Sequence, residues 1–449
     1  MVSFRRFGCD GGVSAAIQVR NSSEHGCNHH CLHICFEHCR GAFNNLRSIA
    51  RRLHNRIFGD KCYLRTFLCV RNRSFALRQS CFVAGASRNT YPRPQGPYRC
   101  EVEEVAMEQI ILNLALWFGL YTIVSLSLNI EYGFAGIPNF GRALAVLMGA
   151  FTVGGLVNRL LMLAFNIQGG ELKEATGRLA STVNEIIANN PAFGIGLILL
   201  SVVLAMIIGA VTGALFILPS AKLSEDYLAI TLLAISEVAF MVFYYHTGII
   251  GGYYGVSVPD VLAFLPGQYR SHAFAVIALL FALLVYIFVE RLLNSPYGRL
   301  LRAMRENESV VEAMGKSVMT LRIKTAAIGS SIAAIAGALF SLYSVNVIAT
   351  SFSRVEWTFY PFLMVLLGGA GNNRGVVVGT FTFVLVKILL TMYKYEIKSA
   401  LMLPFEAVWL EYILFGLLMY FVLLYRPEGL IKEKPIFSKV ILKKVKGKA

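Results

Sequence analysis

Long apolar blocks separated by short polar stretches are the main pattern of this sequence. Most blocks reach the roughly 20 residues that a helix needs to cross the hydrocarbon layer of a membrane. Because no water satisfies backbone groups there, each crossing segment must form its own helical hydrogen bonds. The pattern therefore predicts an all-α, polytopic transmembrane helical bundle. From Met107 onward we expect nine crossings, over 109–130, 143–165, 192–218, 227–246, 272–290, 325–349, 357–371, 375–393 and 407–425.

The composition agrees with a membrane protein, since 56% of the residues are hydrophobic and 15% are charged, against about 25% charged in soluble domains. The loop 291–324 and the tail 433–449 are rich in Lys and Arg, which favours the cytoplasmic side. Four predicted crossings separate them, so both fall on one side of the membrane. We therefore expect a multi-pass protein of the cell membrane with a cytoplasmic basic tail and with Met107 outside.

Residues 1–106 differ from the rest in composition: they contain all nine Cys, and nearly all of their basic residues are Arg. One interpretation is a zinc module at 27–39, although a distant second ligand pair is missing. Another is a targeting peptide, although an amphipathic run is missing. We favour a third, in which translation of the natural protein begins at Met107 and the leader is non-native or disordered. Residues 107–432 then form the membrane domain.

The segment between Asn166 and Asn190 alternates charged and apolar residues at helical spacing. This pattern is typical of an amphipathic helix that lies on the outer membrane surface or touches a soluble partner. A solvated connector is an equally good interpretation.

Three glycine clusters interrupt apolar sequence and are candidates for a solute pathway. In transporters, broken or re-entrant helices expose backbone donors and acceptors to a solute near the bilayer midplane. The alternative is close helix packing, which small residues permit; it explains the third cluster as well as a pathway does, and the first cluster less well. The candidate pathway residues are Gly133, Gly136, Pro138, Asn139, Gly141, Gly251, Gly252, Gly368 and Gly369.

Glu237 and Lys387 are ionisable residues within predicted membrane helices. A charge at the centre of such a helix costs roughly 2.5–3.5 kcal/mol on insertion scales, so we expect each to face the bundle interior and to have a partner. We add Glu237 to the pathway candidates. A structural ion pair is at least as good an explanation for both residues.

The loop 291–324 contains the most specific motif. Ser295 and Pro296 are typical of a helix start, and the residues after them predict a short amphipathic helix between two membrane segments. Such a helix suits contact with a cytoplasmic partner. A solvated loop that obeys the positive-inside rule is the alternative.

From Met107 almost to the C-terminus, the chain resembles the permeases of branched-chain amino-acid ABC importers, a family that also contains ribose-type sugar permeases. The resemblance rests on the order and spacing of five motifs: Asn129 to Phe140 followed by Gly149-Ala-Phe, Asp226-Tyr-Leu-Ala-Ile-Thr-Leu with Glu237, Ser295 to Gly315, Leu366-Leu-Gly-Gly-Ala-Gly, and Arg426-Pro-Glu-Gly-Leu. The third motif is similar to the loop that couples the family to its ATPase. This likeness implies ATPase-coupling roles for Arg299, Arg302, Arg305, Glu306, Glu312, Ala313 and Gly315.

Two departures from the family pattern bear on the solute. Arg142 stands where family members often have His, and the stretch from Gly248 to Gly255 lacks the usual Ser-Asp. They leave the identity of the solute open and do not affect the transporter class.

The sequence favours a permease without catalytic activity of its own. It has no Walker A motif, because the position five before Gly315 is Val310 rather than Gly, and we expect no catalytic residue, metal site or bound cofactor. The resemblance implies that two separate ATP-binding subunits use the ATP. It also implies a second homologous permease and an extracellular solute-binding protein. We expect an importer of branched-chain amino acids or similar small polar solutes, with no nucleic-acid partner.

Two alternatives stay open. One is a secondary transporter driven by an ion gradient, with Glu237 and Lys387 as relay groups. The other is a permease for a sugar.

Overall fold

The computed structural model describes residues 98–166, 172–401, 407–425 and 429–431. All of the elements below belong to one unit of the chain, Pro94–Ala449. The predicted leader lies almost entirely outside the described residues, and the basic tail lies wholly outside them.

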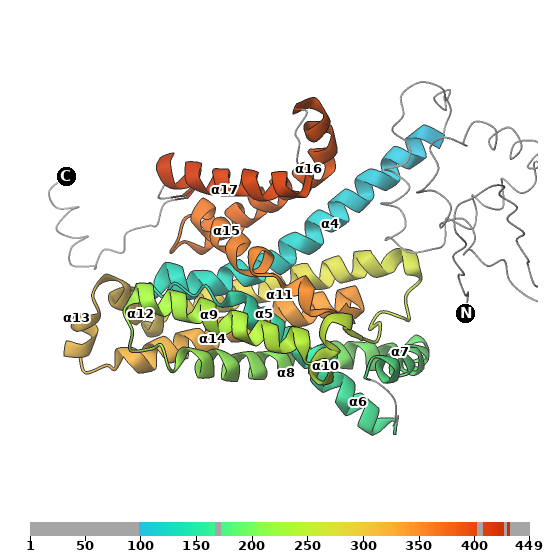
Figure 1. Cartoon of the computed structure of the whole chain (residues 1–449), viewed down its shortest axis with the longest axis horizontal. Helices are drawn as coiled ribbons and strands as arrows, with labels where there is room; N and C mark the ends of the chain where they lie inside the picture. The colour runs from blue at the N-terminus through green and yellow to red at the C-terminus, as the bar shows by residue number, and fades with distance from the viewer. Residues whose placement is uncertain (1–97, 167–171, 402–406, 426–428, 432–449) are drawn as a thin grey trace, which may run out of the picture. The chain divides into compact units, whose positions relative to one another are not determined.

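Within the described part of the chain, seven helices are long and apolar enough to cross a membrane, which confirms the predicted helical bundle. Figure 1 shows most of them running side by side. They are built from α4 (Tyr98–Leu128) with the π-helix η1 (Asn129–Phe134), α5 (Arg142–Phe151) with the π-helix η2 (Thr152–Val157) and α6 (Asn158–Ala164), α8 (Pro191–Ile217), α9 (Glu225–Tyr245), α11 (Gly267–Asn294), α14 (Val318–Ser344) and α16 (Asn373–Leu401).

The predicted crossings at 357–371 and 407–425 are not among these seven helices. The first is a short π-helix, η5 (Val355–Phe359), followed by α15 (Tyr360–Gly368). Fourteen helical residues rise only about 21 Å, less than the roughly 30 Å of the hydrocarbon layer. The second is α17 (Ala407–Tyr425), a 19-residue helix that coincides with the predicted range. Within it, the apolar stretch found among the described residues is Glu411–Val422.

Short elements identify the two ends of the bundle (Figure 1). One, which we call the α12 end, has α12 (Pro296–Glu306) and α13 (Glu308–Ala313) between α11 and α14. The other, which we call the α7 end, has a two-stranded antiparallel sheet that pairs Val256 with Val347. Its elements are α7 (Leu172–Asn189), α10 (Thr247–Ile250), the 3-10 helix η3 (Gly252–Tyr254), β1 (Val256–Ser257), β2 (Asn346–Val347) and the 3-10 helix η4 (Ala349–Phe352).

The chain from β2 to Gly371 passes from the α7 end to the α12 end, although α15 alone is too short to do so. Gly371 N donates a hydrogen bond to Asn129 Oδ1 (3.0 Å), and Asn129 begins η1, which touches α12 through Arg305. After α17, Leu430 N donates to Leu367 O (2.8 Å). The hairpin of α16 and α17 therefore starts and finishes at the α12 end.

α7 is a helix, as the alternation of charged and apolar residues predicted. Leu179, Val183 and Ile187 are fully buried on one of its faces, and Asn184 Oδ1 accepts a hydrogen bond from Asp260 N (2.7 Å). The apolar face is thus covered by this chain itself. The charged face, with Glu174 and Arg178, remains exposed.

Two buried clusters hold the bundle together. The larger cluster spans most of the helices and has α14 at its centre. In the most apolar stretch of α14, 78% of the residues are buried, whereas in that of α9 only 22% are. The smaller cluster joins α15, α16 and α17 to α4, and consists of Tyr121, Tyr360, Leu363, Met364, Phe383, Val384 and Phe415.

Candidate functional site

The first glycine cluster lies at a break in the membrane helices, as predicted. α4 widens into η1 at Asn129, helical structure ends at Phe134, and α5 begins only at Arg142. Gly136 has a φ of +73°, a conformation that other residues rarely adopt. Ile137 N donates to Glu131 O (2.8 Å), which turns the chain back toward η1.

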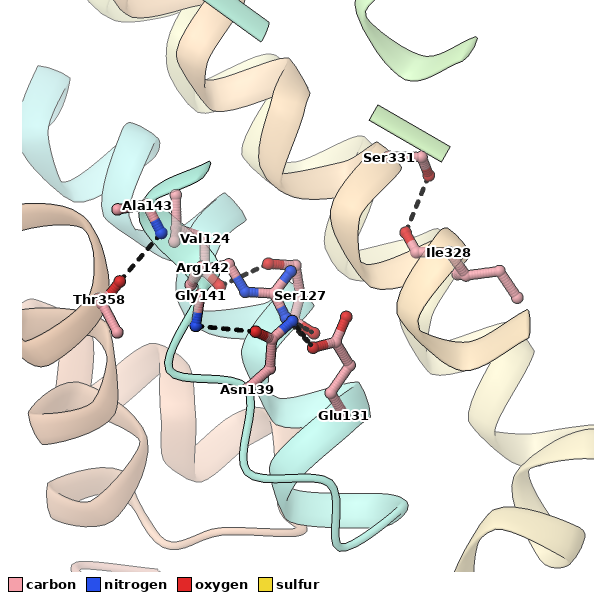
Figure 2. A network of polar contacts seen from close by, with 10 residues as sticks. All are labelled: Val124, Ser127, Glu131, Asn139, Gly141, Arg142, Ala143, Ile328, Ser331 and Thr358. Carbon is pink, nitrogen blue, oxygen red and sulfur yellow. Dashed lines mark hydrogen bonds and ion pairs between the residues drawn. The ribbon is translucent and has the colours of Figure 1, made fainter. Parts of the chain in front are cut away.

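Side chains also hold this break in place (Figure 2). Arg142 Nη2 lies 2.5 Å from Glu131 Oε2, and both side chains are fully buried. Asn139 Nδ2 donates to Glu131 Oε2 (2.8 Å), and Gly141 N donates to Asn139 Oδ1 (2.9 Å). Loss of one partner of a buried ion pair leaves an uncompensated charge and strongly destabilises a protein. These residues therefore fix the geometry of the break.

A small cavity adjoins the break. Asn139 and Gly141 form one part of its wall, and the rest comes from α5, α8, α9 and α14. Its volume is about 20 Å³, enough for a water molecule but not for an amino acid. Of the predicted pathway residues, these two line the cavity.

The other two glycine clusters have different surroundings. Gly251 and Gly252 have φ values of +73° and +56° and form a turn after α9 at the α7 end, so they do not interrupt a membrane helix. A Cβ on Gly368 would lie 2.3 Å from Gly375 O, which shows close packing of α15 on α16. Gly369 follows with a φ of +106°. A pathway role for these four residues stays a prediction.

The helix predicted after Ser295 is confirmed. Ser295 Oγ accepts a hydrogen bond from Tyr297 N (3.2 Å) and so caps α12, and Leu301 and Met304 bury its apolar face. A Cβ on Gly298 would lie 2.0 Å from Leu293 O. Glycine is therefore required where the chain turns sharply from α11 into α12.

A tyrosine anchors α12 to α14. The hydroxyl of Tyr297 is 2.8 Å from Thr325 Oγ1. Burial raises the pKa of Tyr297, so its hydroxyl stays protonated at neutral pH.

Two arginines of α12 point at the broken helix. Arg305 Nη1 donates to Gly133 O, and the Arg302 guanidinium lies 5.0 Å from the centre of the Phe134 ring, a cation–π distance. Arg299 and Glu306 are instead exposed. The four predicted coupling residues of α12 thus fall into an inward pair and an outward pair.

α13 presents an exposed surface at the tip of this end. Asn307 Oδ1 caps the helix by accepting from Ser309 N (3.0 Å), and Val311 is fully buried beneath it. Two apolar side chains are exposed there, Val310 at 49% and Met314 at 69%. We call the following residues the α13 surface: Val310, Glu312, Ala313, Met314 and Gly315.

Arg322 is a structural residue that the sequence did not single out. Its side chain is 7% exposed and pairs with Glu308 of α13, while its Nη1 donates to Ala221 O and Leu223 O (2.9 and 2.7 Å). It ties α13 to the turn between α8 and α9. In the sequence it is one of many basic residues of the loop, and nothing there distinguishes it.

An amide network at the α12 end was also missed. Asn129 Nδ2 donates to Asn373 Oδ1 (2.9 Å), and Asn373 Nδ2 donates to Glu290 Oε2 (2.8 Å). The network joins η1, α16 and α11. Its members are far apart in sequence, so no local pattern predicts it.

Glu237 has the partner that we expected but not the expected location. Its Oε2 lies 2.9 Å from Arg354 Nε, and the two side chains are 31% and 42% exposed. It borders a shallow surface hollow with Val238 and Met241, so it does not face the interior. The helix around it is the least buried of the seven.

Lys387 does face the interior. Its Nζ lies 4.8–5.3 Å from the ring centres of Tyr360, Trp117 and Tyr121, and it donates to Tyr121 Oη (3.1 Å). Glu356 Oε1 is 4.0 Å away. Three aromatic faces and a carboxylate thus stabilise the ammonium, and Lys387 and Glu237 have separate partners.

These features match a known class of membrane protein. A family model described as the permease component of branched-chain amino-acid transport systems matches residues 110–423. The chain belongs to this family. As a member, it is a multi-pass membrane permease of a transport system.

Three relatives show how close the permease is to other members. It is 61% identical over 336 residues to the probable branched-chain amino acid transport permease protein LivM of Methanocaldococcus jannaschii, a match that covers 75% of this chain and 97% of the relative. It is 26% identical over 344 residues to the high-affinity LivM of Salmonella typhimurium, covering 71% and 69% of the two chains. The LivM of Escherichia coli is 28% identical over 252 residues, covering 51% and 56%. No solved structure matches the chain.

Proposed function

We propose that this permease is the membrane subunit of an ATP-driven importer of branched-chain amino acids. Family membership and the names of the relatives support the solute class. One observation carries the coupling mechanism: Arg305 of α12 donates to Gly133 O of the broken helix. A subunit that moves α12 would therefore move the wall of the cavity.

The partners follow from the two ends. Two ATP-binding subunits, which bind and hydrolyse the ATP, contact α12 and the α13 surface, and the α12 end faces the cytoplasm. The α7 end faces outward, where the exposed charges of α7 suit a solute-binding protein. A second homologous permease completes the importer in the cell membrane. The permease itself binds no cofactor.

The transport route runs beside the break. Asn139 and Gly141 line the cavity, and Gly133, Gly136 and Pro138 shape the turn between η1 and α5 that forms its edge. Outward charges at Arg299, Glu306 and Glu312 contact the ATPase, and the inward arginines pass its movement to η1.

Arg305→Gln in the assembled importer, reconstituted in vesicles, tests the coupling. The variant should keep its ATP-binding subunits and hydrolyse ATP, while leucine uptake falls about tenfold, because a hydrogen bond from a charged group is lost. Glu312→Lys should instead release the ATPase on purification. Arg159→Gln is the matched control. Arg159 lies on α6, away from α12, and its Nη2 also donates to a backbone carbonyl, that of Gly248.

Normal uptake by both variants with a retained ATPase would show that the α12 end does not couple transport to ATP. Uptake that follows an ion gradient and survives ATP depletion would favour the secondary transporter. Competition of leucine uptake by ribose would favour a sugar permease.

A further inference from the structure

The buried ion pair of the break has unused bonding capacity. Glu131 and Arg142 are fully buried, yet among the described residues Glu131 Oε1, Arg142 Nε and Arg142 Nη1 have no hydrogen-bond partner. Buried charged groups are stable only when they are paired and hydrogen-bonded. One carboxylate oxygen and two guanidinium nitrogens therefore remain for another ligand.

One face of α14 covers both this pair and the cavity. A Cβ on Gly329 would lie 2.0 Å from Glu131 Oε1, so the free oxygen abuts the α14 backbone. Ala326 and Ser330, which lie on the same side of the helix as Gly329, line the cavity. Separation of α14 from η1 and α5 would join the free atoms of the pair to the cavity in one groove.

The groove would have one charged end and apolar walls. Asn139, Glu131 and Arg142 form the charged end, while Leu232 and Ile235 of α9 contribute apolar wall. We propose that this is a binding site for the zwitterion of an aliphatic amino acid. Glu131 binds the ammonium group, Arg142 binds the carboxylate, and the apolar wall contacts the branched side chain. This inference rests on the proposed function, which supplies the solute class.

The electrostatics of the exchange favour a zwitterion over other solutes. In the closed structure Glu131 and Arg142 neutralise each other, and a zwitterion between them leaves no net charge behind. A hydrogen bond from a guanidinium N–H to a carboxylate is charge-assisted and roughly twice as strong as a neutral one. A solute with only one charged group would bring an uncompensated charge to the buried pair, which is costly.

The experiment is leucine protection of a cysteine in the assembled importer during ATP turnover. The nine Cys of the chain are replaced by Ser, and Ser330→Cys is added to the cavity wall. The rate of labelling by a thiol reagent is then measured against leucine concentration. Leucine should slow the labelling. Arg142→Gln and Glu131→Gln should each require about tenfold more leucine, and Arg142→Lys less than Arg142→Gln.

The matched control is Arg270→Gln, because Arg270 Nη1 pairs with Asp260 Oδ2 at 2.7 Å outside the cavity. In this variant leucine should protect the cysteine as well as in the importer with an unchanged Arg270. 3-Methylbutylamine, which lacks the carboxylate, should not protect even at high concentration. This amine arm uses no substitution at the pair, so it decides the matter if the Gln variants fail to assemble.

Equal protection in the Gln variants, or protection by the amine, would overturn the site. So would leucine uptake without any protection, and that result would leave the proposed function standing. Absence of leucine uptake by the unmodified, assembled importer would overturn the proposed function instead.

Discussion

At the scale of single residues, the membrane charges are stabilised in two ways. Glu131 and Glu237 pair with arginines, whereas Lys387 sits among three aromatic rings. A cation over aromatic faces gains about 2 kcal/mol or more when desolvated. Lys387 therefore needs no transport role to account for its position within an apolar helix.

Substitution of Lys387 separates a structural role from a relay role. Lys387→Met keeps most of the apolar stem and removes the ammonium, so thermal stability in detergent should fall by about 2 kcal/mol. ATP-driven leucine uptake per folded importer should stay near the unmodified level. Lys387→Arg, which keeps a cation, should lose less stability. Abolished uptake in a stable Lys387→Met protein would instead support the ion-coupled alternative.

The sequence located part of the site and could not locate the rest. Asn139 and Gly141 stood out because polar and glycine residues followed an apolar block, and they do line the cavity. Glu131 lies between that block and the glycines, and a charged residue at such a position indicates the end of a membrane segment. Its burial depends on Arg142 and on Gly329 of α14, and no local pattern reports such a distant contact.

At the scale of elements, apolar length predicted the long helices well, and short or irregular elements poorly. The π-helices η1 and η2 were not foreseen, because their wider turns change no hydrophobic pattern. α15 was too short to cross alone, and the chain before it had no helical periodicity to reveal how the crossing is completed.

Close approach of α14 to α5 depends on glycines. A Cβ on Gly337 would lie 1.9 Å from Val146 O, and one on Gly149 would lie 2.0 Å from Ala334 O. No heavy atom lies within 4 Å of a Cβ on Gly196 of α8. The two kinds of glycine therefore respond in opposite ways to the same added methyl group.

Gly337→Ala should destabilise the permease by at least about 1–3 kcal/mol, because the backbones must separate. Gly196→Ala should be neutral or stabilising by about 0.5–1 kcal/mol, because alanine loses less entropy in a helix. Thermal unfolding of the purified variants in detergent compares them. Equal stability of the two would show that α14 is not tightly packed on α5.

At the scale of the whole molecule, the placement of Lys and Arg predicted that the loop and the tail lie on one side. In the structure, residues 429–431 bond to α15 at the α12 end, which agrees with that prediction up to the last described residue. One of the nine expected crossings, 357–371, is too short to cross as a single helix. The loop and residues 429–431 still lie at the same end of the bundle, because the segment from β2 to Gly371 connects the two ends.

Labelling of intact cells tests the orientation. In a chain whose nine Cys are replaced, a membrane-impermeant thiol reagent should reach Glu174→Cys on α7 from outside. It should reach Glu312→Cys on the α13 surface only after the cells are opened. Both side chains are exposed in the permease itself, so in cells that express the permease without its partner subunits, access depends on the side of the membrane. Labelling of Glu312→Cys in intact cells would reverse the orientation and remove the proposed ATPase contact.

The return of the α16–α17 hairpin to its own starting point has a consequence for biogenesis. Chains fold from the N-terminus as they are synthesised, so the larger cluster around α14 can assemble before the hairpin leaves the ribosome. Until then Tyr121 and Tyr360 have no Phe383 or Phe415 to pack against. Among the described helices, the hairpin thus inserts after the others, and the aromatic partners of Lys387 on α4 and α15 are synthesised before it.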